Sequence, residues 1–187
     1  IPQQVDKLKE QGMERIIVVP GFLAHGVHTK VDIPTILKLP HEHIGLDHSH
    51  THHHHHHHHH HGEDEEREAK SDLIDFDGEV IFLDPFEADD KVVDIVENRI
   101  TEYISEKNLN NENTGILLVG HGSSLPFGKE VLMGVTNKIK DRMQEYKIDC
   151  GFMQIEKPSI PESFKKLQDN GFENMVVVPV FLADGLH

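Results

Sequence analysis

The sequence predicts an α/β protein in which helices cover both faces of a parallel sheet, built from a repeated module. One observation is that short β-branched runs alternate with amphipathic stretches along most of the 187 residues. Another is that residues 1–28 and 160–187 are identical at 14 of 28 ungapped positions. The copies lie 159 residues apart, which suits one small domain and is too long for a solenoid repeat. We therefore expect two similar modules in tandem.

The first half of the chain predicts two helices and two strands. Residues 2–12 predict a short helix, because a proline stands in the first turn and a glycine at the end. The β-branched runs at 16–23 and 79–83 are typical of buried parallel strands. Residues 88–106 predict a helix with acidic residues in its first turn and an apolar stripe, at Val92, Val93, Val96, Ile100, Tyr103 and Ile104.

The second half continues the alternation. Residues 116–122 predict a strand that runs into a glycine turn, and residues 128–146 predict a helix from apolar residues at i, i+4 spacing. Two further strands are expected at 149–155 and 175–182, with a helix over 160–171 between them. The near-continuous apolar character of these strands favours a sheet that is buried on both faces.

The module boundary is expected at a polar linker, residues 108–114. Residues 1–107 then form the C-terminal part of the first module, and residues 115–187 form the N-terminal part of the second. The chain opens inside a repeat and does not begin with Met, so we expect it to be a fragment of a longer protein. Between residues 39 and 77 the alternation stops, and a disordered loop is expected because few apolar residues offset the entropy of ordering.

This loop is rich in histidine. Of the 18 histidines in the chain, 14 lie between His41 and His61. An affinity tag and a solvated spacer are both possible explanations, but tags are normally terminal and this run is internal. We favour a native metal-collecting loop, since imidazoles without fixed geometry bind Ni²⁺, Co²⁺, Zn²⁺ or Cu²⁺ without selecting among them.

The overall composition excludes several classes of partner. The net charge of −15 argues against nucleic-acid binding, which needs a basic face, and against adsorption to an anionic membrane. No apolar run approaches the ~18 residues of a membrane span. The single cysteine, Cys150, rules out an internal disulfide framework and favours a reducing compartment, so a cytoplasmic location is expected.

Three histidines follow expected strands. They are His121 in "LLVGHGSS", His28 in "FLAHGVH" and His187 in "FLADGLH". Ligands bind beyond the carboxyl ends of the strands in an open α/β sheet, and neutral imidazole binds transition metals and accepts protons near neutral pH. The turn after the first of these strands also offers groups for a carboxylate or phosphate, at Gly122, Ser123 and Ser124.

Several motifs together resemble one protein family. They are "LLVGHGS", "VVVPVFLADGLH", "DIP", the His-rich loop and the "ADD" sequence before a helix. This combination is similar to the small CbiX-type sirohydrochlorin cobaltochelatases, which include archaeal nickelochelatases of coenzyme F430 biosynthesis. The resemblance implies a chelatase-like (flavodoxin-like) fold that binds a tetrapyrrole in a cleft. It also implies a homodimer or a pseudo-dimer of tandem modules.

The resemblance also implies roles for the histidines. His121 matches the family's first metal-binding histidine, and His28 and His187 match the second. Their implied roles are to hold the incoming metal ion and to help remove two pyrrole N–H protons. His25 and its counterpart Asp184 are weaker candidates for metal ligands.

Two departures from the family pattern concern the second module. Gln154 stands where family members usually have glutamate, and an amide cannot act as a base. Asp184 replaces the His25 of the first copy and is a harder ligand than imidazole. These changes leave two alternatives open, a second module that is less active or one that is tuned to another metal.

The function expected from these observations is insertion of Co²⁺ or Ni²⁺ into sirohydrochlorin, in cobalamin or coenzyme F430 biosynthesis, without ATP or an organic cofactor. One alternative is a His-rich nickel or cobalt storage or delivery protein, and a weaker one is a relative of the ferrochelatases. Because each module is incomplete, we also expect residues 29–107 to complement residues 115–187. Residues 79–83 and 116–121 would then share one parallel sheet, with His121 near His187 or His28.

Overall fold

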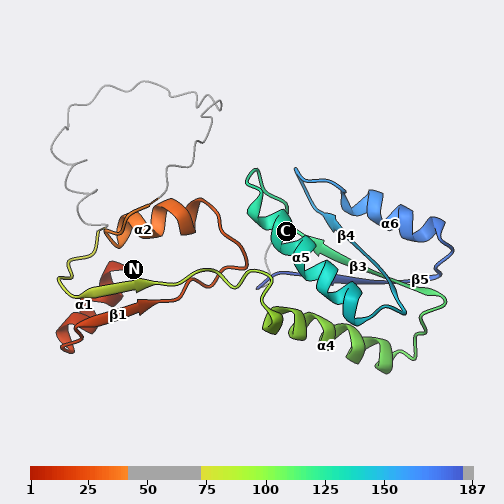
Figure 1. Ribbon diagram of the computed structural model, residues 1–187, viewed down its shortest axis with the longest axis horizontal. Coiled ribbons are helices and arrows are strands. Elements are labelled where there is room, and N and C mark those ends of the chain that lie inside the picture. Colours follow the sequence, from red (N-terminus) through yellow and green to blue (C-terminus); the bar gives the residue numbers. More distant parts are fainter. Residues whose placement is uncertain (42–72, 183–187) are drawn as a thin grey trace, which may run out of the picture. The chain divides into compact units, whose positions relative to one another are not determined.

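The computed structural model describes residues 1–41 and 73–182, which form two compact units (Figure 1). The first unit contains the described residues of 1–20 and 27–84, and the second contains those of 21–26 and 85–187. Both units combine helices with a parallel sheet, as the alternation in the sequence predicts. Across the described ranges, no helix is both long and apolar enough to cross a membrane.

The first unit is built around a two-stranded parallel sheet. Strand β1 (Arg15–Val18) pairs with β2 (Glu79–Phe82) in a register that sets Ile16 opposite Val80. Its helical elements are α1 (Pro2–Glu10), the π-helix η1 (His28–Asp32) and α2 (Ile33–Ile36). No element was expected from the sequence at the last two. Among the described residues of this unit, the buried core consists of Val5, Ile16, Leu37 and Ile74.

The buried Ile74 shows that the His-rich insertion is anchored near its end. Its side chain is 1% exposed, and its backbone N–H donates to the carbonyl of Ile36. This residue fell within the loop expected over 39–77, but burial of the side chain attaches it to the folded unit. Residues 42–72 of that loop, with nearly all of its histidines, lie outside the described residues.

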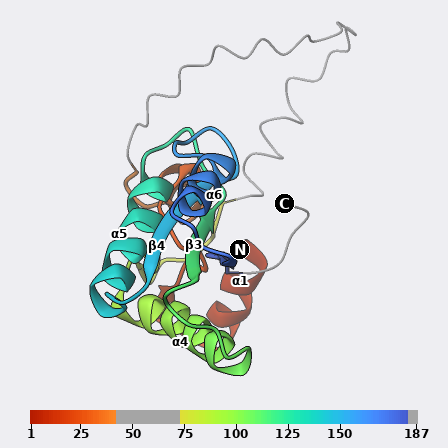
Figure 2. The ribbon, with the colours of Figure 1, turned by 90° about the vertical axis from the view of Figure 1, so that its right-hand side faces the viewer.

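The second unit has a three-stranded parallel sheet in the order β4-β3-β5. The central strand β3 (Thr114–Gly120) is buried at every residue, which explains the apolar run from Ile116 to Val119. Helices lie on both faces of the sheet, as expected (Figure 2). The remaining elements are α4 (Asp90–Glu106), α5 (Phe127–Arg142), β4 (Lys147–Phe152), α6 (Ile160–Asp169) and β5 (Asn174–Pro179).

Alternate residues of β3 divide the core of this unit between the two faces. Ile116 and Leu118 pack in one cluster with residues of α4 and α5, whereas Leu117 and Val119 pack in another with Leu167 of α6. The alternation follows from the two-residue period of a strand. Helices α4 and α5 therefore cover one face of the sheet, and α6 covers the other.

Helix α4 belongs to the second unit although its sequence belongs to the first copy of the repeat. Four residues of its predicted apolar stripe are buried in the larger core cluster, namely Val93, Val96, Ile100 and Ile104. On its polar side, Asp94 and Glu97 accept from the guanidinium of Arg142 on α5, at 2.8 and 2.9 Å. Apolar burial and this charge pairing both attach α4 to α5.

We expected residues 29–107 to complement residues 115–187. This expectation is correct for helix α4 and wrong for strand β2. Residues 79–83 and 116–121 do not share a sheet, because β2 pairs with β1 while β3 pairs with β4 and β5. The physical reason is that β1 lies within the first unit and offers β2 a complete parallel register there. The chain crosses between the units after β2, so the compact units do not coincide with the module limits at 107 and 115.

Candidate functional site

The candidate site of the second unit begins at His121, directly after the central strand. Its position at the carboxyl end of a parallel strand agrees with the expectation for a ligand-binding edge. The next residue, Gly122, has φ +87°, and a Cβ there would collide with the backbone carbonyl oxygen of Gln154. Only glycine allows the two chain segments to approach so closely. The conformation of Gly122 thus allows a close approach to the protein's own backbone.

A hydrogen bond orients the imidazole of His121. Its Nδ1 lies 2.8 Å from the backbone carbonyl oxygen of Gly122. A carbonyl only accepts, so Nδ1 carries the proton of this bond, and in the neutral ring the lone pair is then on Nε2. A carbonyl that fixes the tautomer in this way is common behind metal-binding histidines. The ring is therefore prepared to bind a metal ion, or to accept a proton, through Nε2.

Gln154 is the closest polar neighbour of this histidine in the segment that follows β4. Its backbone N–H donates to the carbonyl of His121 at 3.1 Å, and the preceding N–H, of Met153, donates to Gly120 at 2.9 Å. The side-chain Nε2 of Gln154 lies 3.3 Å from Nδ1 and 3.4 Å from Nε2 of the imidazole. The residue in which the chain departs from the family pattern is therefore in contact with the candidate metal ligand.

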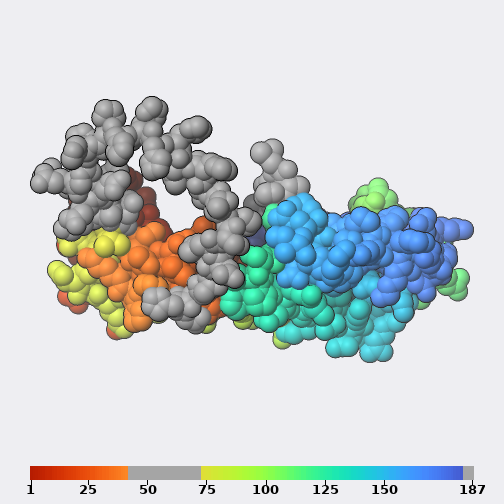
Figure 3. Space-filling view, turned by 90° about the horizontal axis from the view of Figure 1, so that it is seen from above, coloured from red at the N-terminus to blue at the C-terminus, as the bar shows by residue number. Residues whose placement is uncertain are grey.

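The segments after β3 and β4 thus form one continuous rim. Figure 3 shows them next to each other at one end of the second unit. Lys129, in the first turns of α5, lies 3.3 Å from Glu156, whose side chain is only 16% exposed. This ion pair links the two segments a second time, beyond the contact of Gln154 with His121.

The serines of the turn have different environments. Ser123 accepts a hydrogen bond from the backbone N–H of Leu125 at 3.1 Å, so its hydroxyl supports the turn itself. Ser124 is exposed. Helix α5 starts at Phe127, three residues further on, with Pro126 as N-cap and no side-chain cap bond. The first turn of this helix is therefore the feature that suits a carboxylate of a ligand.

His25, from the first copy of the repeat, also belongs to the second unit. Its side chain is 13% exposed, and its ring packs edge-on against Phe127 at 5.9 Å between centroids. Its Nε2 lies 3.6 Å from a carboxylate oxygen of Glu87. Because Phe127 opens α5 and His121 precedes the same helix, both histidines lie around the start of α5. Glu87 was not expected from the sequence, since no local pattern connects it with His25.

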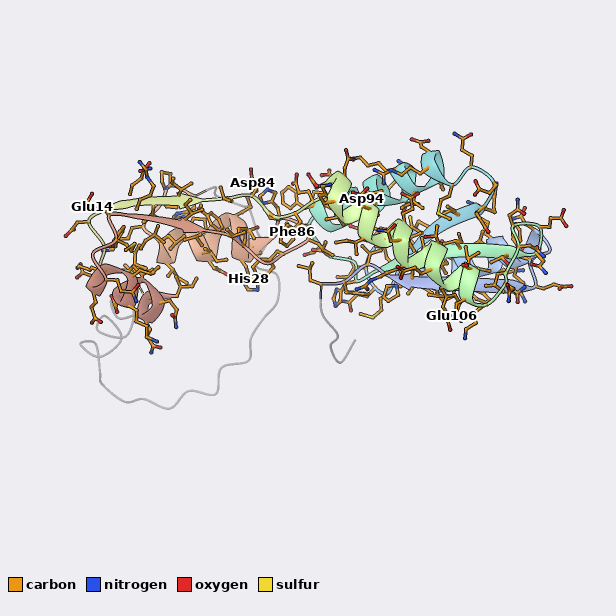
Figure 4. All side chains as sticks on the ribbon, turned by 90° about the horizontal axis from the view of Figure 1, so that it is seen from below. Glu14, His28, Asp84, Phe86, Asp94 and Glu106 are labelled. Atoms are coloured by element: carbon orange, nitrogen blue, oxygen red, sulfur yellow. The ribbon has the colours of Figure 1, made fainter. Side chains whose placement is uncertain are left out.

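The other predicted histidines are placed differently. His28 lies in the first unit, at the start of η1, and its Nδ1 is 2.7 Å from Asp32 (Figure 4). His187 and Asp184 lie outside the described residues. The pairing of His121 with His187 or His28 therefore stays a prediction. Within the described part of the chain, no three His, Cys, Asp or Glu side chains converge as a metal site would require.

The rim after β4 ends in a well-formed start of α6. Ser159 and Glu162 form a reciprocal capping box, and Lys157 lies 2.8 Å from the Glu162 carboxylate. Together with the backbone N–H of Ser159, these partners lower the pKa of Glu162 to about 2, with the Lys157 hydrogen bond as the largest cause. The segment from Met153 to Ser159 is thus anchored at both ends.

These features define an α/β protein with a histidine site at the carboxyl edge of a parallel sheet. The CbiX family model matches residues 1–103 and 115–187, and the chain belongs to this family. The match falls in two segments, and residues 104–114 between them lie outside it.

The curated relatives carry a more specific name. The chain is 47% identical to the sirohydrochlorin cobaltochelatase of Methanothermobacter thermautotrophicus over 73 residues, which are 39% of this chain and 50% of the relative. It is 52% identical to the enzyme of that name from Methanocaldococcus jannaschii over 72 residues, which are 38% of this chain and 50% of the relative. The chain thus spans about half the length of the curated relatives it matches.

A solved structure confirms the fold class. The structure of SirB from Bacillus subtilis with Fe³⁺ matches with a TM-score of 0.67 and 22% sequence identity. The match covers 100% of this chain and 60% of SirB. At this identity the likeness supports the chelatase-type α/β fold.

Proposed function

We propose that this chain is part of a chelatase that inserts Co²⁺ or Ni²⁺ into sirohydrochlorin. The observation that carries the proposal is the turn after β3, where a backbone carbonyl leaves Nε2 of His121 as the lone-pair nitrogen. Membership of the CbiX family and the shared name of the relatives supply the reaction. Cobalt is the first metal to test, because both relatives are named cobaltochelatases. Nickel shares the same ligand preferences.

The reaction exchanges one divalent cation for two protons of the macrocycle. Its charges balance without a change of oxidation state, so it needs neither an organic cofactor nor a redox partner. His121 can hold the metal through Nε2 before transfer, and can take up a pyrrole proton once the metal has left. The second proton needs another acceptor, for which His187, His28 and His25 are the proposed candidates.

The macrocycle carries carboxylates, so its binding needs local groups that offset the negative charge of the chain. The net charge of −15 repels an anionic substrate at long range. The first turn of α5, directly after the His121 turn, is the proposed carboxylate-binding element, with Gly122, Ser123 and Ser124 beside it. We further propose that a homodimer, or a pseudo-dimer of tandem modules, encloses the substrate. The single, buried Cys150 supports a reducing compartment such as the cytoplasm.

Anaerobic incubation of the protein with sirohydrochlorin and Co²⁺ or Ni²⁺, followed by absorbance, tests this function. A shift of the absorption bands that depends on protein and metal is expected, and His121→Ala should lose it. A band shift no faster than in buffer, under conditions in which the chain is folded, would contradict the proposal.

The histidine content supports a second candidate, a metal-storage or delivery protein. Deletion of residues 41–61 separates the two functions. A chelatase keeps its turnover at saturating metal when the loop is deleted, whereas a storage protein loses most of its bound metal and has no turnover to keep. Metal content and insertion rate, measured on the same preparation, give opposite outcomes for the two functions.

A further inference from the structure

Two large apolar side chains stand exposed on the rim of the candidate site. Met153 is 40% exposed and Ile155 is 67% exposed. They flank Gln154 in the sequence, and the amide of Gln154 contacts the ring of His121. The apolar surface is therefore continuous with the site that holds the candidate metal ligand.

Ile155 also has an unfavourable backbone conformation. Its φ is +63°, in the left-handed region that β-branched residues rarely adopt and that glycine adopts without steric cost. The side chain is mostly in solvent, so packing within the described residues does not compensate for this conformation. Strained residues of this kind concentrate at sites where the backbone serves a function.

The neighbouring residues impose the conformation. The backbone N–H of Glu156 donates to the carbonyl of Gln154 at 2.6 Å, and the Glu156 side chain pairs with Lys129. On the other side of the segment, the N–H of Phe152 donates to the carbonyl of Pro158 at 2.9 Å. The segment is thus tied to α5 and to the end of β4, and these ties hold the Ile155 side chain at the rim.

We propose that the side chains of Ile155 and Met153 contact one face of the tetrapyrrole macrocycle. This is the macrocycle from which His121 takes protons and to which it passes the metal ion. This inference rests on the proposed function and adds a substrate-binding contact to it. A tetrapyrrole is flat and apolar on its faces and carries its carboxylates at the edge. In the free protein the isoleucine is exposed to water. Its burial against such a face removes apolar surface from water and so contributes favourable free energy to substrate binding.

Three substitutions separate the side chain from the backbone conformation. Ile155→Gly and Ile155→Asn both suit a positive φ and both remove the apolar surface, so the melting temperature should not fall. Ile155→Leu keeps the apolar surface. The affinity for metal-free sirohydrochlorin, from anaerobic fluorescence titration, should fall about tenfold for the first two variants, the size of one apolar contact. Ile155→Leu should bind like the unaltered chain.

Two matched controls belong to the test. Ile95 is 56% exposed on α4, so Ile95→Asn makes the same chemical change away from the rim. Asn108 has φ +50°, and Asn108→Gly relieves a positive φ at the far end of α4. Neither should change the affinity. A purely structural role for the Ile155 side chain would instead lower the melting temperature of both variants and leave the affinity unaltered.

The outcomes distinguish this inference from the proposed function. If the chain binds sirohydrochlorin and inserts metal, but Ile155→Gly and Ile155→Asn bind as tightly as the unaltered chain, the inference is wrong and the function stands. If affinity depends on Ile155 but no metal is inserted, the contact stands and the function is wrong. If the unaltered chain does not bind sirohydrochlorin, both are wrong.

Discussion

At the scale of single residues, the candidate site depends on two interlocked backbone segments. Gly122 is required because the carbonyl of Gln154 occupies the space of a Cβ, and that contact brings the Gln154 amide to His121. The carbonyl of Gly122 in turn orients the imidazole. A glycine, a histidine and an amide that look independent in the sequence therefore act as one group.

His121→Ala should abolish metal insertion and leave the melting temperature nearly unchanged. The side chain lies in a loop and is only partly buried, so its loss removes a ligand and little packing. Insertion of Co²⁺ into sirohydrochlorin and thermal unfolding, measured on the same variant, check this. Metal insertion at the unaltered rate would show that His121 is not the ligand.

Gln154→Glu should tighten Co²⁺ binding by about tenfold or more, because a carboxylate beside Nε2 adds a negative charge next to the candidate metal ligand. Equilibrium dialysis of a variant without residues 41–61 measures this site without the loop histidines. Gln144→Glu, at an exposed position of the same unit, makes the same change as a control. Equal affinities for the two variants would show that position 154 does not face the metal.

At the scale of elements, ion pairs add to the apolar contacts that pack helix α4 against helix α5. Helix α4 is attached to α5 by Lys138 to Asp90 at 2.7 Å and by Arg142 to Asp94 and Glu97. These pairs lower the pKa values of Asp90 and Asp94 and raise that of Arg142, mainly through the side-chain hydrogen bonds. These ion pairs lie at the surface, where such pairs add little to the free energy of unfolding. Their main effect is to specify which sides of the two helices face each other.

The start of α6 should make stability depend on pH. The folded protein holds the pKa of Glu162 at about 2, below its ordinary value near 4.5. The contribution is therefore fully present above about pH 4.5 and is lost as the pH falls towards 2. Glu162→Gln should lower the melting temperature by a few degrees at pH 7, and the difference from the unaltered chain should vanish near pH 2.

Melting curves across this range, with Glu145→Gln as a control at an exposed glutamate of the same unit, check the assignment. A constant difference between the Glu162→Gln variant and the unaltered chain from pH 7 to pH 2 would show that the capping box does not depend on the charge of Glu162.

At the scale of the whole molecule, the chain combines two compact units with a histidine-rich insertion. The insertion contains most of the 14 histidines of residues 41–61 and interrupts the first unit between α2 and β2. The insertion is the proposed metal-collecting loop, and the proposed metal site at His121 is part of the second unit.

Metal bound by the insertion should be weakly held, and lost as the pH falls below the imidazole pKa of ~6.5. Calorimetric titration with Ni²⁺ should show several sites at pH 7.5 and few at pH 5. A chain in which residues 52–61 are asparagine serves as the control and should lose most of these sites at pH 7.5. Equal binding at both pH values would contradict histidine ligation.

The sequence alone predicted the class of fold and the position of most elements, and it placed His121 directly after a strand. Period-two and period-3.6 patterns and the internal repeat are local properties that packing preserves, as the buried stripe of α4 and the buried strand β3 illustrate. Only the tertiary structure decided which elements join. Strand β2 pairs with β1 while α4, a few residues later, packs on the second unit. It also brought Gln154 to His121 and left Ile155 exposed at positive φ, because such contacts depend on backbone approaches between distant segments that no local pattern encodes.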